Sequence, residues 1–318
     1  MQQQQQPAEE DYGDDSDEDE VKERQHFAAI VRAFDHYKPW ALAKVDKLEV
    51  DYQRLGAREQ QLVNTAGKID RMRKAINANA ELLQRVVKPH RKHVGEEEEA
   101  QLDAQAAQCA RSGQLVSQRH RARSYVPETD MEKLQSTIKQ FVREWGNDGK
   151  PEREAAHTPL LEALQSAMGP DAARRGARVL VPGAGLGRLA WEVARLGYRV
   201  QASEFSYFML IAGNYVLNGL QQSAASGGAQ TFDVHPWVLQ TCNVRSLADQ
   251  LRAEAVPDVA PWSLPPEAQL SMCAGDFLEV YKDQRCAGPA RAATWEAARA
   301  AKGSAVGLVS AARGSLGS

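Results

Sequence analysis

The chain has 318 residues, enough for one or two domains, and its hydrophobic fraction of 43% is typical of a soluble globular protein. Its formal net charge of −3 argues against a general nucleic-acid binder, because such proteins carry an excess of basic residues. No apolar run approaches the roughly 20 residues that a membrane helix requires, so no membrane contact is expected.

Residues 1–20 consist mainly of a glutamine run followed by an acidic run. Such a segment cannot bury enough apolar surface to fold, so we expect a disordered acidic leader. It lacks the apolar stretch of a signal peptide. Docking to a basic partner is the functional alternative, and a merely solvated leader is the interpretation that the composition favours.

Residues 21–93 are predicted to form a helical arm. Its first helix should end near Tyr37, because Pro39 interrupts the pattern, and a second helix follows. The third helix, over residues 58–88, repeats apolar side chains at seven-residue spacing, at Leu62, Ile69, Ile76 and Leu83. This repeat predicts an antiparallel packing seam and favours packing within the chain over a homodimer, which stays an alternative.

Residues 94–128 show no lasting periodicity and are predicted to be a low-complexity insertion. The histidines in and beside it have no cysteine or acid at ligand spacing, so we expect no metal site. The cysteines form no CxxC pair, which favours reduced thiols inside the cell over a disulfide framework. We expect a cytoplasmic protein, with the nucleus as a second location.

The segment Thr129-Asp-Met-Glu132 fits a capping box and should begin a helix that runs to about Trp145. On this helix Gln140 and Arg143 are three residues apart, so both side chains could reach one ligand. An exposed polar pair without a ligand is the alternative.

The centre of the chain is a strand, a glycine turn and a helix. Arg178 to Val181 is a short apolar run typical of a buried strand, and Gly183, Gly185 and Gly187 follow it at alternate positions. Helical spacing then continues to Leu196. This order is typical of a nucleotide-binding α/β sheet, in which glycines let the backbone approach a ligand and the helix N-terminus offers free N–H groups.

Two acids follow later predicted strands. The strand that starts at Tyr198 ends at Glu204, about twenty residues after the first glycine, where such folds place an acid that binds ribose hydroxyls. The strand Gln269 to Ala274 is followed by glycine, Asp276 and Phe277. A carboxylate there can accept a hydrogen bond from an exocyclic amine, and the aromatic ring can cover a purine face. Solvent-exposed carboxylates are the alternative.

Four stretches together resemble the carnosine N-methyltransferase family, whose members are S-adenosylmethionine-dependent enzymes with a Rossmann-like sheet. They are, in chain order, Lys139-Gln-Phe-Val-Arg143, Val181-Pro-Gly-Ala-Gly-Leu-Gly-Arg-Leu-Ala-Trp191, Ser206-Tyr-Phe-Met-Leu210 and Ser271-Met-Cys-Ala-Gly-Asp-Phe277. The resemblance implies an α/β fold preceded by helices, with residues 129–283 as a partial methyltransferase domain. It implies methylation of the imidazole of carnosine, β-alanyl-histidine, to give anserine.

The resemblance also implies a cofactor site. Gln140 and Arg143 would hold the amino-acid end of S-adenosylmethionine, and Gly183 would let the backbone close on it. Glu204 would bind the ribose hydroxyls. Asp276 would accept from the adenine amine, with Phe277 against the ring.

The chain departs from the family after Asp283. The family residues that hold carnosine lie in later segments, and residues 284–318 match none of them. We therefore expect a sheet that is incomplete at its C-terminal end, an unmatched low-complexity tail, and little or no transferase activity in the chain as written. No catalytic residue is assigned.

Two rival functions stay open. The run Gly185-Leu-Gly-Arg-Leu-Ala190 fits the G-x-G-x-x-A form of an NAD(P)-dependent oxidoreductase, and Glu204 suits either cofactor. A non-catalytic scaffold that binds a partner through residues 21–88 is the other rival.

For the methyltransferase function, the expected partner is a small molecule or peptide substrate that carries an imidazole.

Overall fold

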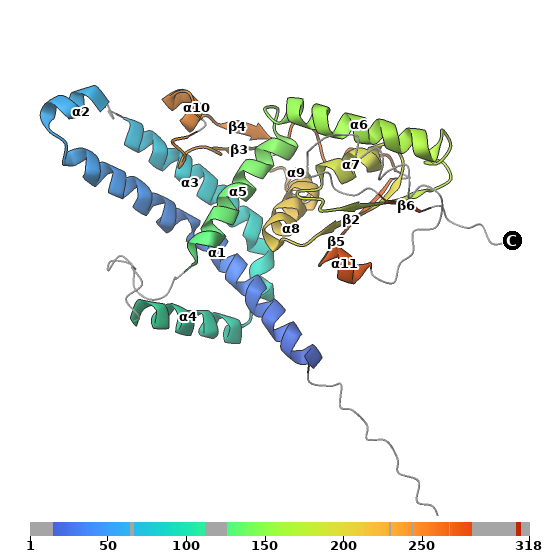
Figure 1. Ribbon diagram of the computed structural model, residues 1–318, viewed down its shortest axis with the longest axis horizontal. Helices are drawn as coiled ribbons and strands as arrows, with labels where there is room; N and C mark the ends of the chain where they lie inside the picture. The colour runs from blue at the N-terminus through green and yellow to red at the C-terminus, as the bar shows by residue number, and fades with distance from the viewer. Residues whose placement is uncertain are drawn as a thin grey trace, which may run out of the picture.

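The computed structural model describes residues 15–63, 67–111, 126–228, 230–242, 244–266, 268–281 and 310–312. In Figure 1 a helical arm extends to one side of a small twisted sheet, and further helices lie over the sheet. The fold is thus a mixture of helices and a small, mainly parallel sheet, as the sequence predicted. The expected change at Asp283 and the tail lie outside the described residues, apart from residues 310–312.

The sheet has four described strands in the order β5-β2-β1-β6. The three predicted strands are confirmed as β1 (Arg178–Pro182), β2 (Arg199–Glu204) and β5 (Gln269–Ala274), and they run parallel. On the other side of β1, β6 (Ser310–Ala312) pairs antiparallel. Pro182 pairs with Ser203, and Glu204 pairs with Ala274, so the C-terminal ends of β1, β2 and β5 meet at one edge of the sheet.

Two apolar cores stabilise this arrangement. One lies between the sheet and two helices, α6 (Lys150–Met168) and α7 (Arg188–Arg195), and includes Leu164, Val179 and Val193. The other joins the helical arm to α5 (Glu128–Trp145) and α8 (Tyr207–Asn214). Burial of such apolar surface contributes roughly 25 cal/mol per Å², so the second core fixes the arm against the sheet domain.

The arm differs from the prediction at its first helix. The helix α1 (Asp15–Gln53) is continuous through Pro39 and begins within the predicted disordered leader. Pairs of Lys22 with Glu18 and Asp19 support this first part, because charges three and four residues apart face each other on a helix. Packing overrides the proline, since Tyr37 and Ala41 on either side of it are buried in the core.

The predicted packing seam is largely confirmed within the chain. The third predicted helix divides into α2 (Ala57–Val63) and α3 (Lys68–Val87), and α3 packs along α1. Ile69, Ile76 and Leu83 are buried, whereas Leu62 is 77% exposed, so the seam begins only at α3.

The predicted low-complexity insertion contains a helix, α4 (Glu96–Arg111), which the lack of an apolar face had concealed. Residues 112–125 lie outside the described ranges. The helix α5 begins at Glu128 with Pro127 as its N-cap and no side-chain cap, so the predicted capping box at Thr129 is wrong. Glu128 instead bonds to Trp40 and Lys44 of α1.

The remaining described elements are short. They are η1 (Lys88–His93), η2 (Tyr215–Gly219), α9 (Leu220–Ala225), β3 (Phe232–Val234), α10 (Leu247–Leu251), β4 (Glu254–Val256) and α11 (Phe277–Val280). The strands β3 and β4 form a separate antiparallel pair. Among the described helices, none combines the length and the apolar character that crossing a bilayer requires.

Candidate functional site

The three glycines after β1 all have positive φ, with values of 62° at Gly183, 58° at Gly185 and 86° at Gly187. Side chains rarely adopt this region, so the turn depends on glycine. A Cβ on Gly183 would meet nothing within 4 Å, whereas a Cβ on Gly185 would lie 2.4 Å from Oε1 of Glu144. The turn therefore has an open side at Gly183 and a packed side at Gly185.

The structure corrects one prediction about this turn. The N–H groups of the turn and of Arg188, the first residue of α7, are not free, because each N–H from Ala184 to Arg188 has an acceptor. The acceptors, in that order, are Ser203 O at 3.0 Å, Glu204 Oε2 at 2.8 Å, Glu144 Oε1 at 3.1 Å, Ala184 O at 2.9 Å and Glu144 Oε2 at 3.2 Å. Within residues 184–188, all of which the structure describes, no N–H is left for a phosphate of the kind that often binds before a helix.

Glu204 lies at the predicted place, at the end of β2 beside the glycine turn. Its Oε2 accepts from Gly185, and its Oε1 accepts from the N–H groups of Phe205 at 2.9 Å and Ser206 at 2.8 Å. Three backbone donors thus fix the carboxylate at the sheet edge. Phe205 next to it is 70% exposed, so this edge presents an apolar ring as well as an acid.

Asp276 and Phe277 follow β5 at the same edge. The N–H of Gly275 donates to the carbonyl oxygen of Glu204 at 3.1 Å, which ties the end of β5 to the end of β2. Asp276 is exposed and caps α11 by accepting from Leu278 at 2.7 Å. The ring of Phe277 lies 5.3 Å from that of Tyr281. The structure therefore brings Gly183, Glu204, Asp276 and Phe277 to one edge.

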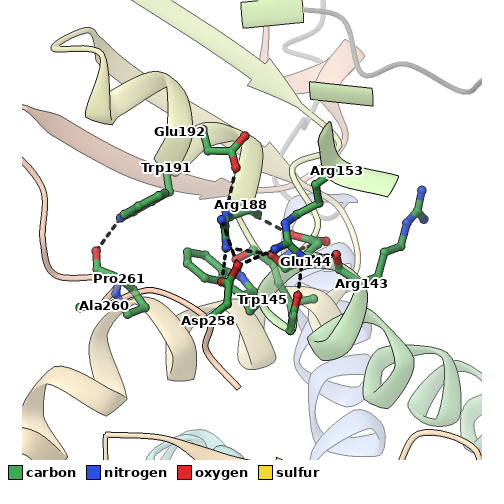
Figure 2. Close-up of polar contacts among 12 residues, drawn as sticks. Arg143, Glu144, Trp145, Arg153, Arg188, Trp191, Glu192, Asp258, Ala260 and Pro261 are labelled. Carbon is green, nitrogen blue, oxygen red and sulfur yellow. Dashed lines mark hydrogen bonds and ion pairs between the residues drawn. The ribbon is translucent and has the colours of Figure 1, made fainter. Parts of the chain in front are cut away.

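The two predicted cofactor residues of α5, Gln140 and Arg143, lie in different surroundings. Gln140 donates to Glu144 Oε1 at 3.0 Å and so reaches the glycine turn indirectly. Arg143 is exposed, pairs with Glu152 at 2.8 Å and points away from Arg188 in Figure 2. The structure does not bring Arg143 into the cluster, and its contact with a cofactor stays a prediction.

Sequence reasoning missed Glu144, which is only 9% exposed. Burial raises the pKa of its carboxyl group, and hydrogen bonds from the N–H groups of Leu186 and Arg188 oppose this shift. Next to it, the indole N–H of Trp145 donates to Leu186 O at 3.2 Å. The last turn of α5 therefore supports the glycine turn from its packed side. Its position beside Arg143 was the one sequence signal, and it does not distinguish a buried acid from an exposed one.

Sequence reasoning also missed a buried ionic cluster behind the turn, drawn in Figure 2. Asp258 accepts from Arg153 at 2.5 Å and from Arg188 at 2.5 Å, and all three side chains are at most 8% exposed. Arg153 also donates to the carbonyl oxygens of Arg143 and Gly146, both at 2.8 Å. The cluster connects α5, α6, α7 and the segment after β4, so it holds the first residue of α7 in place.

A pocket of about 320 Å³ lies next to this cluster, between α6 and α7. His157 and Glu192, joined at 2.8 Å, line it together with Arg153 and Arg188. None of the six predicted site residues lines this pocket, so it is separate from the sheet edge. Within the described ranges, no group of His, Cys, Asp or Glu side chains is arranged to hold a metal ion.

Comparison with known proteins gives the family. Residues 120–299 match the model of a family described as carnosine N-methyltransferase. The chain is 37% identical to the carnosine N-methyltransferase of Mus musculus over 84% of this chain and 62% of that protein. It is 33% identical to carnosine N-methyltransferase unmet of Drosophila melanogaster over 83% of this chain and 58% of that protein.

A shorter match, 40% identical over 48% of this chain, links it to the carnosine N-methyltransferase of Schizosaccharomyces pombe and covers 39% of that protein. The chain thus spans about 62% of the length of its mouse relative. The family model covers more than half of the chain, including the glycine turn, Glu204 and Asp276. On this match, the chain belongs to the carnosine N-methyltransferase family.

Proposed function

We propose that this chain binds S-adenosylmethionine at the common edge of β1, β2 and β5 and serves methyl transfer to the imidazole of carnosine, giving anserine. One observation carries the proposal: Glu204 accepts from Gly185 at 2.8 Å, beside the open side of the turn at Gly183. Ligands of α/β sheets bind in the crevice outside the carboxyl ends of the strands, which is where these residues lie.

The residues at the edge fit the parts of this cofactor. Glu204 offers carboxylate oxygens to ribose hydroxyls, and Asp276 offers them to an adenine amine. Phe277 supplies an aromatic face for the adenine, and the open space over Gly183 accommodates a ligand close to the backbone. The amino-acid end would reach Gln140 and Arg143, and Arg143 would exchange its pair with Glu152 for the cofactor carboxylate.

The chemistry asks little acid–base help of the protein. The bound cofactor supplies an electrophilic methyl group on a sulfonium. Because the pKa of imidazole is about 6.5, most of the acceptor is neutral and nucleophilic at neutral pH. The protein must therefore align the acceptor nitrogen with the methyl group, and orientation of this kind can be worth roughly 7–11 kcal/mol.

The geometry weighs against the dinucleotide alternative. A Rossmann dinucleotide site binds pyrophosphate through N–H groups at the start of the first helix. Here the N–H groups of Leu186 and Arg188 are bonded to Glu144, and that of Gly185 to Glu204. A second anion beside these three N–H groups would meet two carboxylates. The scaffold alternative predicts that neither cofactor binds.

Calorimetric titration with S-adenosylhomocysteine and with NADH tests the proposal. The chain should bind S-adenosylhomocysteine and not NADH, and Glu204→Ala should weaken binding roughly 10- to 100-fold, because a charge-assisted hydrogen bond is lost. Glu132→Ala, which removes an exposed acid on α5, is the matched control. Binding of NADH, or of neither ligand, would refute the proposed cofactor.

The acceptor needs a separate assay. The assay measures transfer of a labelled methyl group to carnosine, with β-alanyl-alanine as the control peptide. Mass spectrometry of the product then tests whether it is anserine. Turnover on carnosine alone would support the substrate and contradict the expectation that the chain as written has little activity. Cofactor binding without turnover would agree with that expectation. Equal labelling of the control peptide would refute an imidazole acceptor.

A further inference from the structure

The carboxylate of Glu144 occupies the position of a bound anion at the start of α7. It comes from α5, and its two oxygens accept from the N–H groups of Leu186 at 3.1 Å and Arg188 at 3.2 Å. A helix N-terminus binds anions through such N–H groups and through the positive end of its dipole. Here the protein supplies the anion from its own chain.

The fit at this position is close. Oε1 of Glu144 lies so near the turn that a Cβ on Gly185 would come within 2.4 Å of it. The side chain is 9% exposed, and Gln140 fixes the same oxygen with a hydrogen bond of 3.0 Å. The carboxylate therefore fills the space beneath the turn and is held from both sides.

Burying a charge is costly unless it is paired or well bonded, and three hydrogen bonds to Glu144 offset this cost. Two of its three hydrogen bonds fix the backbone at Leu186 and Arg188, and the third, from Gln140, fixes the carboxylate itself. The opposite side of the turn at Gly183 stays open. The bonds on the packed side therefore determine the shape that the open side presents to a ligand.

We propose that Glu144 is a positioning and specificity-determining residue: its carboxylate replaces the phosphate of dinucleotide-binding proteins, orders the turn for a cofactor without phosphate, and excludes pyrophosphate. This inference rests on the proposed function, because it concerns the same cofactor edge. Glu144 touches the turn and not the reacting atoms, so it acts through the backbone.

Two variants test the inference. In Glu144→Gln one oxygen becomes an NH₂ group, which cannot accept, so the amide has one acceptor oxygen for three donors. Affinity for S-adenosylhomocysteine should then fall roughly 10- to 100-fold. In Glu144→Ala the N–H groups of Leu186 and Arg188 lose their acceptor. Inorganic pyrophosphate should then bind, and the affinity for S-adenosylhomocysteine should fall. Glu132→Gln, an exposed change on the same helix, should alter neither affinity.

The outcomes separate the two proposals. If the unmodified chain fails to bind S-adenosylhomocysteine, the proposed function fails. If it binds and Glu144→Gln binds equally well, the positioning role is wrong. If pyrophosphate binds the unmodified chain as well as Glu144→Ala, the exclusion role is wrong. If Glu144 served only packing, Glu144→Ala would weaken the binding of S-adenosylhomocysteine and would not strengthen the binding of pyrophosphate. Should Glu144→Ala not fold, Glu144→Gln, which keeps the size of the side chain, still decides the positioning role through its affinity for S-adenosylhomocysteine.

Discussion

Gly183 and Gly185 provide a matched pair of substitutions that separates stability from cofactor binding. Both have similar positive φ values, 62° and 58°, so an alanine suffers similar backbone strain at either position. They differ in surroundings, because the Cβ of Gly183→Ala enters open space and that of Gly185→Ala approaches Oε1 of Glu144 to 2.4 Å. The pair therefore isolates the contact with Glu144.

The magnitudes follow from this difference. A left-handed alanine costs about 1–2 kcal/mol, and the loss of glycine entropy from the unfolded chain returns about 0.5–1 kcal/mol. Gly183→Ala should therefore lower the free energy of unfolding by about 1 kcal/mol. Gly185→Ala should lower it by a further 1–3 kcal/mol or so, because a buried, hydrogen-bonded carboxylate must move.

Urea denaturation and titration with S-adenosylhomocysteine measure the two effects. Gly183→Ala should lose roughly tenfold or more in affinity while it keeps most of its stability, because its methyl group enters the space proposed for the ligand. Gly185→Ala should lose mainly stability. If the unfolding free energies of the two variants agree within about 0.5 kcal/mol, the packing of Glu144 against the turn is wrong.

Two further predictions concern the ionic cluster behind the turn. Asp258→Asn should lower the free energy of unfolding by about 3–5 kcal/mol, because it leaves Arg153 and Arg188 buried without their shared carboxylate. Urea denaturation measures this loss, and a loss below about 1 kcal/mol would contradict the role of the ion pairs. Burial would raise the pKa of Glu192, but hydrogen bonds and charges from His157 and Arg188 outweigh it and lower the pKa below 4.5. A lowered carboxyl pKa stabilises the folded state above pH 4.5, and this contribution is lost as the pH falls through the folded pKa. Thermal melts at decreasing pH should therefore show the advantage over Glu192→Gln shrinking below about pH 4.5, whereas a constant advantage would contradict the pairing.

The sequence predicted the elements whose pattern is local. An apolar run, alternate glycines and a helical face identified β1, the turn and α7, because strand and helix periods are visible within a few residues. The local pattern also placed Glu204 at the end of one strand and Asp276 just after another. The structure shows that these strands are parallel neighbours, so their C-terminal ends lie together. The packing seam of α3 was likewise predicted from its seven-residue repeat of apolar side chains.

The sequence misjudged elements whose outcome depends on packing. Pro39 should end a helix, yet α1 continues through it because its neighbours are buried against α3. The acidic residues before Val21 and the polar helix α4 carry no apolar face from which a helix could be inferred. Propensity and charge are weak priors that tertiary contacts override.

The partners on the packed side of the glycine turn were decided only by the tertiary structure. Glu144 meets Leu186 across 42 residues and Asp258 meets Arg188 across 70, distances over which no periodicity connects two positions. Along α5, Arg143 and Glu144 are adjacent charged residues, but one step of a helix rotates a side chain by about 100°, so one is exposed and the other is buried. The sequence alone therefore determined that a glycine turn and two acids meet at a sheet edge. The packing of α5 decided which acid lies beneath that turn.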